Sequence, residues 1–369
     1  MTLKDSLLFS PKQIGAFTVK NRLAVAPMTR VSADNAGFMT PAMAQYYQGF
    51  ADAGFGLIIT EGLYTDKLFS QTYRYQPGLA ALAQANSWQP LLASLKGSNT
   101  LLIAQLMHGG ALSQYNKYRD HTRGPSAVRP LGQQMPFYYG QGQYPQPEQM
   151  TEQDIREVID GFVCAAVNAK AAGFHGVEIH GANGYLLDQF LTPYINRRKD
   201  SYGGPLNNRL RLYKEILQAV RGAVGEDFIV GVRFSQKKVN DSEHTWPEKV
   251  EAAWQTFTLA KNCRVDYIHT TEPVASAPAF DKAPSLAALA KHYSGLPVIA
   301  NGGVNEGQQA LEVLGSEDAD MIAIGRAALA NPRWVEAISR GEALRAFDYK
   351  MFKPLANLDS ARRYFESLT

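Results

Sequence analysis

Short apolar segments alternate with amphipathic ones from the N-terminal region to near residue 340, and this alternation constrains the fold more than any other feature. The apolar segments, which we expect to form strands, are 22–27, 56–61, 101–106, 176–181, 228–235, 267–272, 297–302 and 321–326. The amphipathic segments, which we expect to form helices, are 41–53, 88–96, 151–172, 206–224, 247–261, 285–293, 306–314 and 331–339. Apolar strands that alternate with helices form a parallel sheet buried on both faces, and eight such units close into a barrel. The sequence therefore predicts an α/β fold, a single (β/α)8 TIM barrel.

One domain is expected to account for the whole chain, residues 1–369. A chain of 369 residues and 40.6 kDa is long for one domain, but α/β barrels often reach this size. Two regions leave the repeating pattern: an insert at 108–150 after the third strand, and a C-terminal tail at about 340–369. The insert carries an aromatic group, Phe137, Tyr138, Tyr139 and Tyr144, on the face where barrel active sites lie. It forms either a substrate lid or a structural cap over the barrel mouth.

Composition excludes several classes of protein. Hydrophobic residues make up 45% and charged residues 19% of the chain, which is ordinary for a folded protein with a large core. The net charge of +3, with no long run of Lys or Arg, argues against a nucleic-acid partner. Cys164 and Cys263 lack any Cys-x-x-Cys spacing, which argues against an iron–sulfur cluster or disulfide scaffold. With no signal-peptide pattern and no apolar stretch of about 20 residues, we expect a cytoplasmic protein without a membrane partner.

Alternation along each strand predicts which side chains face the barrel interior. Neighbouring residues of a strand point to opposite faces, so an inward His180 places Glu178 inward and Val177 outward. The same argument directs Arg233 and Gln105 inward on their own strands. A buried Arg or Glu without a partner is costly. We therefore expect Glu178 and Arg233 to pair, with their charged groups within about 6 Å.

The turn after the fourth predicted strand carries three polar side chains, His180, Asn183 and Tyr185. Gly181 and Gly184 allow the backbone to turn sharply, so the imidazole, the carboxamide and the phenol can face one cavity. A single His at a strand end is commonly structural, but these three groups together suit binding and proton transfer. The turn therefore predicts a reactive site at the barrel mouth.

The ends of the seventh and eighth predicted strands form a candidate anion site. Barrels characteristically bind phosphate with the loops that follow these two strands. The residues there are Asn301, Gly302, Gly303, Gly325 and Arg326. Their glycines permit close backbone approach and the guanidinium supplies a forked charge, although simple tight turns are an alternative. No Gly-x-Gly-x-x-Gly or Walker loop follows a strand, which argues against a Rossmann dinucleotide site.

Taken together, these motifs resemble the old yellow enzyme family, the FMN-dependent NAD(P)H ene-reductases. The resemblance covers nearly the whole predicted barrel at family-like spacing. The matching segments are 21–30 (NRLAVAPMTR), 56–62 (GLIITEG), 105–108 (QLMH), 180–190 (HGANGYLLDQF), 196–198 (NRR), 202–204 (YGG), Arg233, 301–303 (NGG) and 325–326 (GR). Ordered motifs over this length do not arise readily by chance.

The resemblance implies an FMN that lies across the barrel mouth and is reduced by NADH or NADPH. The residues implied to contact it are Ala26, Pro27, Met28, Thr29, Gly62, Gln105, Arg233, Asn301, Gly302, Gly303, Gly325 and Arg326. Thr29 stands where the family bonds the flavin carbonyl near N5, and the absence of Cys there implies non-covalent binding. Gln105 would bind the pyrimidine edge, and Arg233 would place positive charge near N1. The turns after the last two strands would bind the phosphate.

The resemblance also implies reduction of the C=C bond of activated alkenes, which are α,β-unsaturated carbonyl or nitro compounds. His180 and Asn183 resemble the donors that hold the substrate oxygen, and Tyr185 resembles the phenol that protonates the α-carbon. Many relatives have a second His at the position of Asn183, whereas an amide stays neutral. Two alternatives are a same-fold flavoenzyme that acts on nitro esters or dehydrogenates cyclic ketones, and a non-catalytic flavin-binding protein. No His-x-His or His-Glu-x-x-His motif occurs, so no metal site is expected.

The sequence departs from the family after His108, where Gly109, Gly110 and Ala111 replace a run that usually includes Arg. The missing Arg leaves the anchoring of this loop open. The chain also ends soon after the barrel, without the cysteine cluster and added domains of longer relatives. We therefore expect the nicotinamide to deliver electrons directly to the flavin in a ping-pong cycle.

A few further residues and the assembly have open or structural interpretations. The aromatic residues after the second strand either line the pocket or pack against the lid; they are Tyr64, Phe69, Tyr73 and Tyr75. Lys237 and Lys238 are expected in a solvated loop, and His269 is expected to be structural. Both a monomer and a homo-oligomer are compatible with the sequence.

Overall fold

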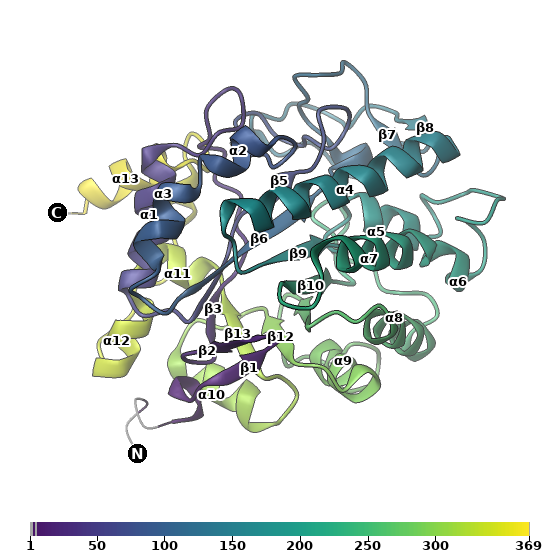
Figure 1. Cartoon of the computed structure of the whole chain (residues 1–369). Coiled ribbons are helices and arrows are strands. Elements are labelled where there is room, and N and C mark those ends of the chain that lie inside the picture. The colour runs from purple at the N-terminus through teal and green to yellow at the C-terminus, as the bar shows by residue number, and fades with distance from the viewer. Residues whose placement is uncertain (1–2, 4–5, 369) are drawn as a thin grey trace.

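A closed ring of parallel strands forms the centre of the protein, as seen in a computed structural model that describes Leu3 and residues 6–368 (Figure 1). Within the described residues the barrel strands are β3 (Leu23–Val25), β4 (Leu57–Ile59), β6 (Leu101–Met107), β9 (Gly176–His180), β10 (Ile229–Phe234), β11 (Tyr267–Thr271), β12 (Val298–Asn301) and β13 (Met321–Ile324). Each strand pairs in parallel with its neighbours, and the pairing of β4 with β6 completes the ring. The predicted α/β barrel is confirmed.

Helices surround this ring (Figure 1). They are α1 (Pro41–Asp52), α3 (Gln89–Leu95), α4 (Glu152–Ala172), α7 (Arg211–Val224), α8 (Val250–Asn262), α9 (Leu286–Ser294), α10 (Gly307–Gly315) and α12 (Trp334–Arg340). α4 begins with a reciprocal cap: Thr151 Oγ1 accepts the N–H of Asp154 at 3.1 Å, and the Asp154 carboxylate accepts the N–H of Thr151 at 2.8 Å. The single helix predicted at 206–224 is wrong, because Leu210, with ψ of −7°, interrupts it.

Shorter elements occupy the connections. The short helices are α2 (Leu82–Asn86), α5 (Leu186–Leu191), α6 (Leu206–Arg209), α11 (Arg326–Ala330), α13 (Leu358–Glu366), η2 (Leu7–Phe9), η3 (Gly110–Leu112), η4 (Pro136–Tyr138) and η5 (Tyr349–Phe352). The short strands are β1 (Lys12–Ile14), β2 (Phe17–Val19), β5 (Leu63–Tyr64), β7 (Arg123–Gly124) and β8 (Glu148–Gln149). β1 and β2 form an antiparallel hairpin that the sequence did not predict. Its Ile14 and Val19 pack with Leu57, Leu101 and Ile229, the first residues of three barrel strands, so the hairpin closes the amino-terminal end of the barrel.

The predicted alternation of inward and outward side chains is confirmed. Ile103 and Ile229 belong to an apolar cluster inside the barrel. Val177, Ile179 and Val232 belong to the larger cluster between the barrel and its helices. The intervening polar residues of the same strands therefore face the interior, and those nearest the carboxyl ends face the mouth.

The insert and the C-terminal tail meet beside the barrel mouth. The backbone N–H of Ala356 donates to the carbonyl of Phe137 at 2.9 Å, and the Phe137 and Phe352 rings lie 5.9 Å apart. Arg30 fixes the tail further, since its Nη2 donates to the carbonyl of Asn357 at 2.9 Å. α13 then packs beside α1 (Figure 1). That the whole chain forms one domain stays a prediction.

Across the described part of the chain, none of the helices combines the length and the apolar character needed to traverse a lipid bilayer.

Candidate active site

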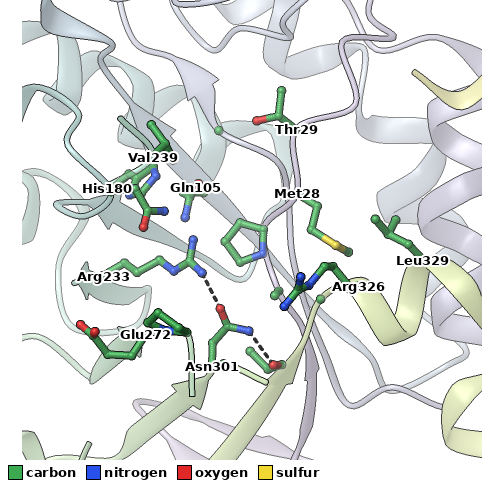
Figure 2. Close-up of a pocket in the computed structure, with 18 of the residues that line it drawn as sticks. Met28, Thr29, Gln105, His180, Arg233, Val239, Glu272, Asn301, Arg326 and Leu329 are labelled. Carbon is green, nitrogen blue, oxygen red and sulfur yellow. Dashed lines mark hydrogen bonds between the residues drawn. The ribbon is translucent and has the colours of Figure 1, made fainter. Parts of the chain in front are cut away.

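A cavity of about 370 Å³ opens at the carboxyl ends of the barrel strands (Figure 2). Every residue that the sequence assigned to the site lines it. These residues are Ala26, Pro27, Met28, Thr29, Gly62, Gln105, His180, Asn183, Tyr185, Arg233, Asn301, Gly302, Gly303, Gly325 and Arg326. The volume lies within the range of about 300–1,000 Å³ that is usual for small-molecule sites. Segments distant in the sequence therefore converge on one pocket, while their individual roles toward a ligand stay predictions.

Arg233, on β10, supplies buried positive charge to the pocket between His180 and Asn301 (Figure 2). Its Nη2 donates to Asn301 Oδ1 at 2.9 Å, but its Nε has no hydrogen-bond partner among the described residues. Burial lowers the pKa of Arg233 to about 10, so the group is still a cation at neutral pH. A buried guanidinium with an unused N–H is a suitable site for an electron-rich or anionic group of a ligand.

Among the described residues, Glu178 and Arg233 form no ion pair within 4 Å, although the charge of Arg233 acts on the carboxylate, and the expected separation of about 6 Å stays a prediction. The Glu178 carboxylate instead accepts hydrogen bonds from Gln105 Nε2 at 2.8 Å, Tyr267 Oη at 3.0 Å and His269 Nδ1 at 2.8 Å. Burial opposes its ionisation, but His269, Arg233 and Gln105 together lower its pKa to about 2. His269 thus holds a buried carboxylate, in keeping with its expected structural role.

Strand register accounts for part of this arrangement, but not for the choice of His269 over Arg233, because those two residues lie side by side in the pairing of β10 with β11. Arg233 lies beside His180 in the pairing of β9 with β10, whereas Glu178 lies beside Gly231, two residues deeper in the barrel. Gln105 lies beside Glu178 across the pairing of β6 with β9. Because the Gln105 amide nitrogen donates to Glu178, its carbonyl oxygen is the atom left to accept a hydrogen bond from a ligand.

His180, at the end of β9, presents a neutral imidazole to the pocket. Burial, together with the charge of Arg233, lowers its pKa to about 3. Its Nδ1 lies 3.4 Å from the backbone N–H of Ala182 and accepts that hydrogen bond. The ring hydrogen therefore sits on Nε2, which can donate to a ligand oxygen.

Asn183 follows in a left-handed conformation, with φ of 63°, which Asn adopts more readily than most residues. Its N–H donates to Ser235 Oγ at 2.8 Å, and its carbonyl accepts the N–H of Val239 at 3.1 Å. These bonds attach the His180–Tyr185 turn to the loop after β10. The amide side chain itself lines the pocket.

A buried ion pair strengthens the same attachment. Lys238 Nζ lies 2.7 Å from Asp188 Oδ1, and the other Asp188 oxygen accepts the N–H of Gly184 at 2.6 Å. The expectation of a solvated Lys238 is wrong, because Asp188 at the start of α5 provides a buried carboxylate for it. Lys237, its neighbour, is only partly buried.

Tyr185 completes the turn and contacts a second phenol. Its hydroxyl oxygen lies 2.5 Å from that of Tyr73, and its ring packs edge-on to His180 at 5.0 Å. Burial raises the pKa of Tyr185 above its ordinary value, so it is protonated at neutral pH.

Of the aromatic residues after the second strand, Tyr73 reaches the site through its contact with Tyr185. The rings of Tyr64, Phe69 and Tyr75 pack against Tyr118, His121 and Tyr139 respectively.

The insert contributes directly to the pocket wall. Met135, Phe137 and Tyr138 line the cavity, and the Tyr138 hydroxyl donates to the carbonyl of Thr29 at 3.2 Å. From the C-terminal tail, Phe352 also lines the cavity. The insert therefore forms part of the pocket wall, which both a substrate lid and a structural cap over the barrel mouth would do.

The far end of the pocket carries the candidate anion residues. Gly302 has φ of 148°, and a Cβ there would clash with the carbonyl oxygen of Glu272. Arg326 is exposed, and its Nη1 lies 3.3 Å from the Tyr349 hydroxyl. The Asn301 side chain forms its hydrogen bonds within the protein. It accepts from Arg233 and donates to the carbonyl of Ala323 at 2.9 Å (Figure 2).

Gln189 anchors the loop after His108. Its Oε1 accepts the N–H of Ala111 at 3.0 Å, and its Nε2 donates to the carbonyl of Gly109 at 3.1 Å. An amide from α5 therefore holds this loop, whose anchoring the sequence left open.

Sequence reasoning missed several residues of the pocket wall. Glu272, Val239, Leu329 and Phe352 line the cavity without having been assigned to it. Burial raises the pKa of Glu272 to about 7. The sequence could have indicated Glu272, because this residue ends the sixth predicted strand, at the face of the barrel where active sites lie. No comparable signal pointed to Phe352, since it comes from the tail.

Residues 7–345 of this eight-stranded α/β barrel match the NADH:flavin oxidoreductase / NADH oxidase family, which identifies the protein as a flavin oxidoreductase. The chain belongs to this family, the old yellow enzyme family. No group of three or more His, Cys, Asp or Glu side chains in the described ranges could hold a metal ion.

Individual relatives agree with this membership. The chain is 32% identical over 368 residues to 12-oxophytodienoate reductase 7 of Oryza sativa subsp. japonica, covering 95% of this chain and 92% of that protein. It is 30% identical to a probable flavin mononucleotide-dependent alkene reductase of Leishmania infantum, covering 94% of each. The structure of the old yellow enzyme homologue from Zymomonas mobilis has a TM-score of 0.84 at 29% identity, covering 96% of this chain and 99% of that one.

Proposed function

We propose that this protein is an FMN-dependent NAD(P)H ene-reductase that reduces the C=C bond of α,β-unsaturated carbonyl or nitro compounds. The observation that carries the proposal is the presence of His180, Asn183 and Tyr185 in one cavity with Arg233. Two relatives, a 12-oxophytodienoate reductase and a probable flavin mononucleotide-dependent alkene reductase, support it. We further propose that the protein works in the cytoplasm, with NADH or NADPH as reductant.

The residues of the pocket fit a non-covalent FMN, which when bound supplies the N5 position that accepts and donates hydride. The unpartnered Nε of Arg233 and the free carbonyl of Gln105 suit the polar edge of a pyrimidine ring. Gly302, Gly303 and Arg326 line the same cavity, where the backbone N–H groups and the guanidinium would bind the phosphate. The remaining proposed contacts come from Ala26, Pro27, Met28, Thr29, Gly62, Asn301 and Gly325.

The reactive side chains have separate tasks in this proposal. His180 Nε2 and the Asn183 amide donate hydrogen bonds to the carbonyl or nitro oxygen of the substrate, which leaves the β-carbon electron-poor. Tyr185, protonated at neutral pH, donates its proton to the α-carbon. Tyr138 and Met135 of the insert limit the access of water. Nicotinamide and alkene use the same cavity in turn.

Purified protein tests the proposal. A yellow protein that NADH or NADPH bleaches under anaerobic conditions, and that cyclohexenone then reoxidises, would support it. Bleaching without reoxidation by the enone would instead indicate a flavoenzyme for nitro esters or cyclic ketones. A flavin that never bleaches would indicate a binding protein, and a colourless protein that FMN cannot reconstitute would refute the cofactor.

Tyr185→Phe separates the two half-reactions. We expect reoxidation by the enone to slow by roughly 10²–10⁴-fold, because this step needs the phenolic proton. Reduction of the flavin by the nicotinamide needs no such proton and should stay within about twofold. Stopped-flow absorbance measures both rates, and equal losses in the two half-reactions would contradict the role of Tyr185.

A further inference from the structure

The hydroxyls of Tyr73 and Tyr185 form a buried pair that the proposed reaction does not by itself require. Their oxygen atoms lie 2.5 Å apart, and the residues are separated by 112 positions in the sequence. Tyr73 is 0% exposed and Tyr185 6% exposed. Tyr73 does not line the cavity, so its hydroxyl depends on Tyr185 for a hydrogen bond, whereas Tyr185 can also reach a ligand there.

The positions of the two hydroxyls decide which one can donate during the reaction. Both rings belong to one buried cluster with Val31 and Met107, but only Tyr185 of the two lines the cavity, near Arg233. Burial raises the pKa of both phenols, and either oxygen can donate in the resting pair. Once Tyr185 gives its proton to a ligand in the cavity, only Tyr73 still carries a proton for the shared hydrogen bond, so Tyr73 must donate.

The loop between β5 and α2 holds Tyr73 in this position. Gln76 Oε1 accepts the N–H groups of Thr72 at 2.8 Å and of Tyr73 at 3.3 Å. Gln76 Nε2 in turn donates to the carbonyl of Gly62 at 2.7 Å, on the wall of the pocket. The Tyr73 ring also lies 4.8 Å from that of Tyr138 in the insert. The donor is thus preorganised by the residues that shape the cavity.

We propose that Tyr73 is a positioning residue whose hydroxyl donates a hydrogen bond to Tyr185 and stabilises the Tyr185 oxygen as it gives up its proton. This inference rests on the proposed function. In that reaction the β-carbon gains a hydride from the reduced cofactor, the Tyr185 O–H bond breaks, and a C–H bond forms at the α-carbon. The electron pair stays on the Tyr185 oxygen, which regains a proton from solvent before the next cycle. Tyr73 keeps its own proton throughout.

Tyr73→Phe tests the inference, because it removes one oxygen and keeps the ring. We expect reoxidation by cyclohexenone to slow by roughly 10- to 100-fold, the effect of a lost hydrogen bond to a charged group. Reoxidation by ferricyanide, which takes electrons without protonating carbon, should stay within about twofold, as should flavin reduction and FMN affinity. The solvent deuterium isotope effect on the enone step should rise as proton transfer becomes more limiting.

Tyr64→Phe is the matched control. It also breaks a pair of tyrosine hydroxyls, between buried Tyr64 and partly buried Tyr118 at 3.1 Å, but Tyr64 does not line the cavity. It should leave the enone rate unchanged. The double variant Tyr73→Phe/Tyr185→Phe should be no slower with the enone than Tyr185→Phe alone, because Tyr73 acts only through Tyr185.

Three results would overturn the inference: an unchanged enone rate in Tyr73→Phe, equal slowing with ferricyanide, or further slowing of the Tyr185→Phe protein. If the proposed function itself is wrong, the result is different: the enone does not reoxidise the flavin of the wild-type protein at all. That result would overturn both proposals, whereas wild-type behaviour of Tyr73→Phe in an active enzyme would overturn only this one.

Discussion

His180 presents a neutral hydrogen-bond donor to the pocket, and this state can be tested with a phenol ligand. A phenolate is expected to occupy the site of the substrate oxygen, so His180→Ala should weaken its binding by roughly tenfold or more. Burial and Arg233 lower the pKa of His180 to about 3. Protonation of His180 should therefore not change the phenol affinity of the wild-type protein between about pH 5 and 8. Flavin absorbance during a phenol titration measures the affinity, and an unchanged value in the variant would argue against the assignment.

Glu272 should make stability depend on pH near neutrality. Burial raises the pKa of this carboxyl from 4.5 to about 7 in the folded protein. The folded state therefore binds more protons than the unfolded state between these values, and the stabilisation is lost as pH rises through 7. The glutamine side chain of the Glu272→Gln variant cannot ionise, so the variant lacks this loss of stability. The difference in free energy of unfolding, variant minus wild type, should therefore increase by about 1–3 kcal/mol from pH 5 to pH 8.

Denaturant unfolding at the two pH values measures this difference. Glu243→Gln, at an exposed position in the loop after β10, provides the control and should show no such change. If Glu272→Gln follows wild type at both pH values, Glu272 does not have the raised pKa in solution.

At the scale of secondary-structure elements, the reactive turn depends on the attachment of α5 to the loop after β10. The Lys238–Asp188 ion pair, at 2.7 Å and fully buried, joins the two elements. Lys238→Met should lower the free energy of unfolding by about 3–5 kcal/mol, because it leaves the Asp188 carboxylate buried without its counter-ion. It should also weaken phenol binding, because Val239 N–H holds the Asn183 carbonyl from the same loop.

Lys237→Met is the adjacent control, since Lys237 is partly exposed and its loss should cost less than about 1 kcal/mol. Thermal and denaturant unfolding compare the two variants. Similar stabilities for both would show that the ion pair does not hold the turn in place.

At the scale of the whole molecule, a ligand that spans the barrel mouth should stabilise the fold, because residues from distant segments meet at one cavity. FMN should raise the unfolding temperature in a concentration-dependent way, equivalent to about 2.7 kcal/mol when its free concentration is 100 times its Kd. Riboflavin, which lacks the phosphate, should stabilise less, since it cannot use Gly302, Gly303 and Arg326. Equal stabilisation by the two would contradict the proposed phosphate site.

The architecture and most of the pocket were predictable because they depend on local patterns. Alternation of strand and helix places each β/α unit, and the two-residue period of a strand decides which side chains face inward. Since all parallel strands end at the same face of a barrel, residues at strand ends must meet at its mouth. That reasoning brought His180, Gln105, Arg233 and the Gly302–Gly303 turn to one cavity without knowledge of any contact between them.

Contacts between distant segments were decided only by the tertiary structure. Glu178 bonds to His269 and forms no ion pair within 4 Å with Arg233, although His269 and Arg233 lie side by side in the sheet. The two-residue period of a strand does not specify this choice of partner. The N-terminal hairpin, the tail residue Phe352 and the Lys238–Asp188 pair likewise depend on packing between remote parts of the chain. The sequence by itself determined the barrel and the chemical groups at its mouth. Only folding determined which of them touch, because burial selects partners among all groups brought close in space.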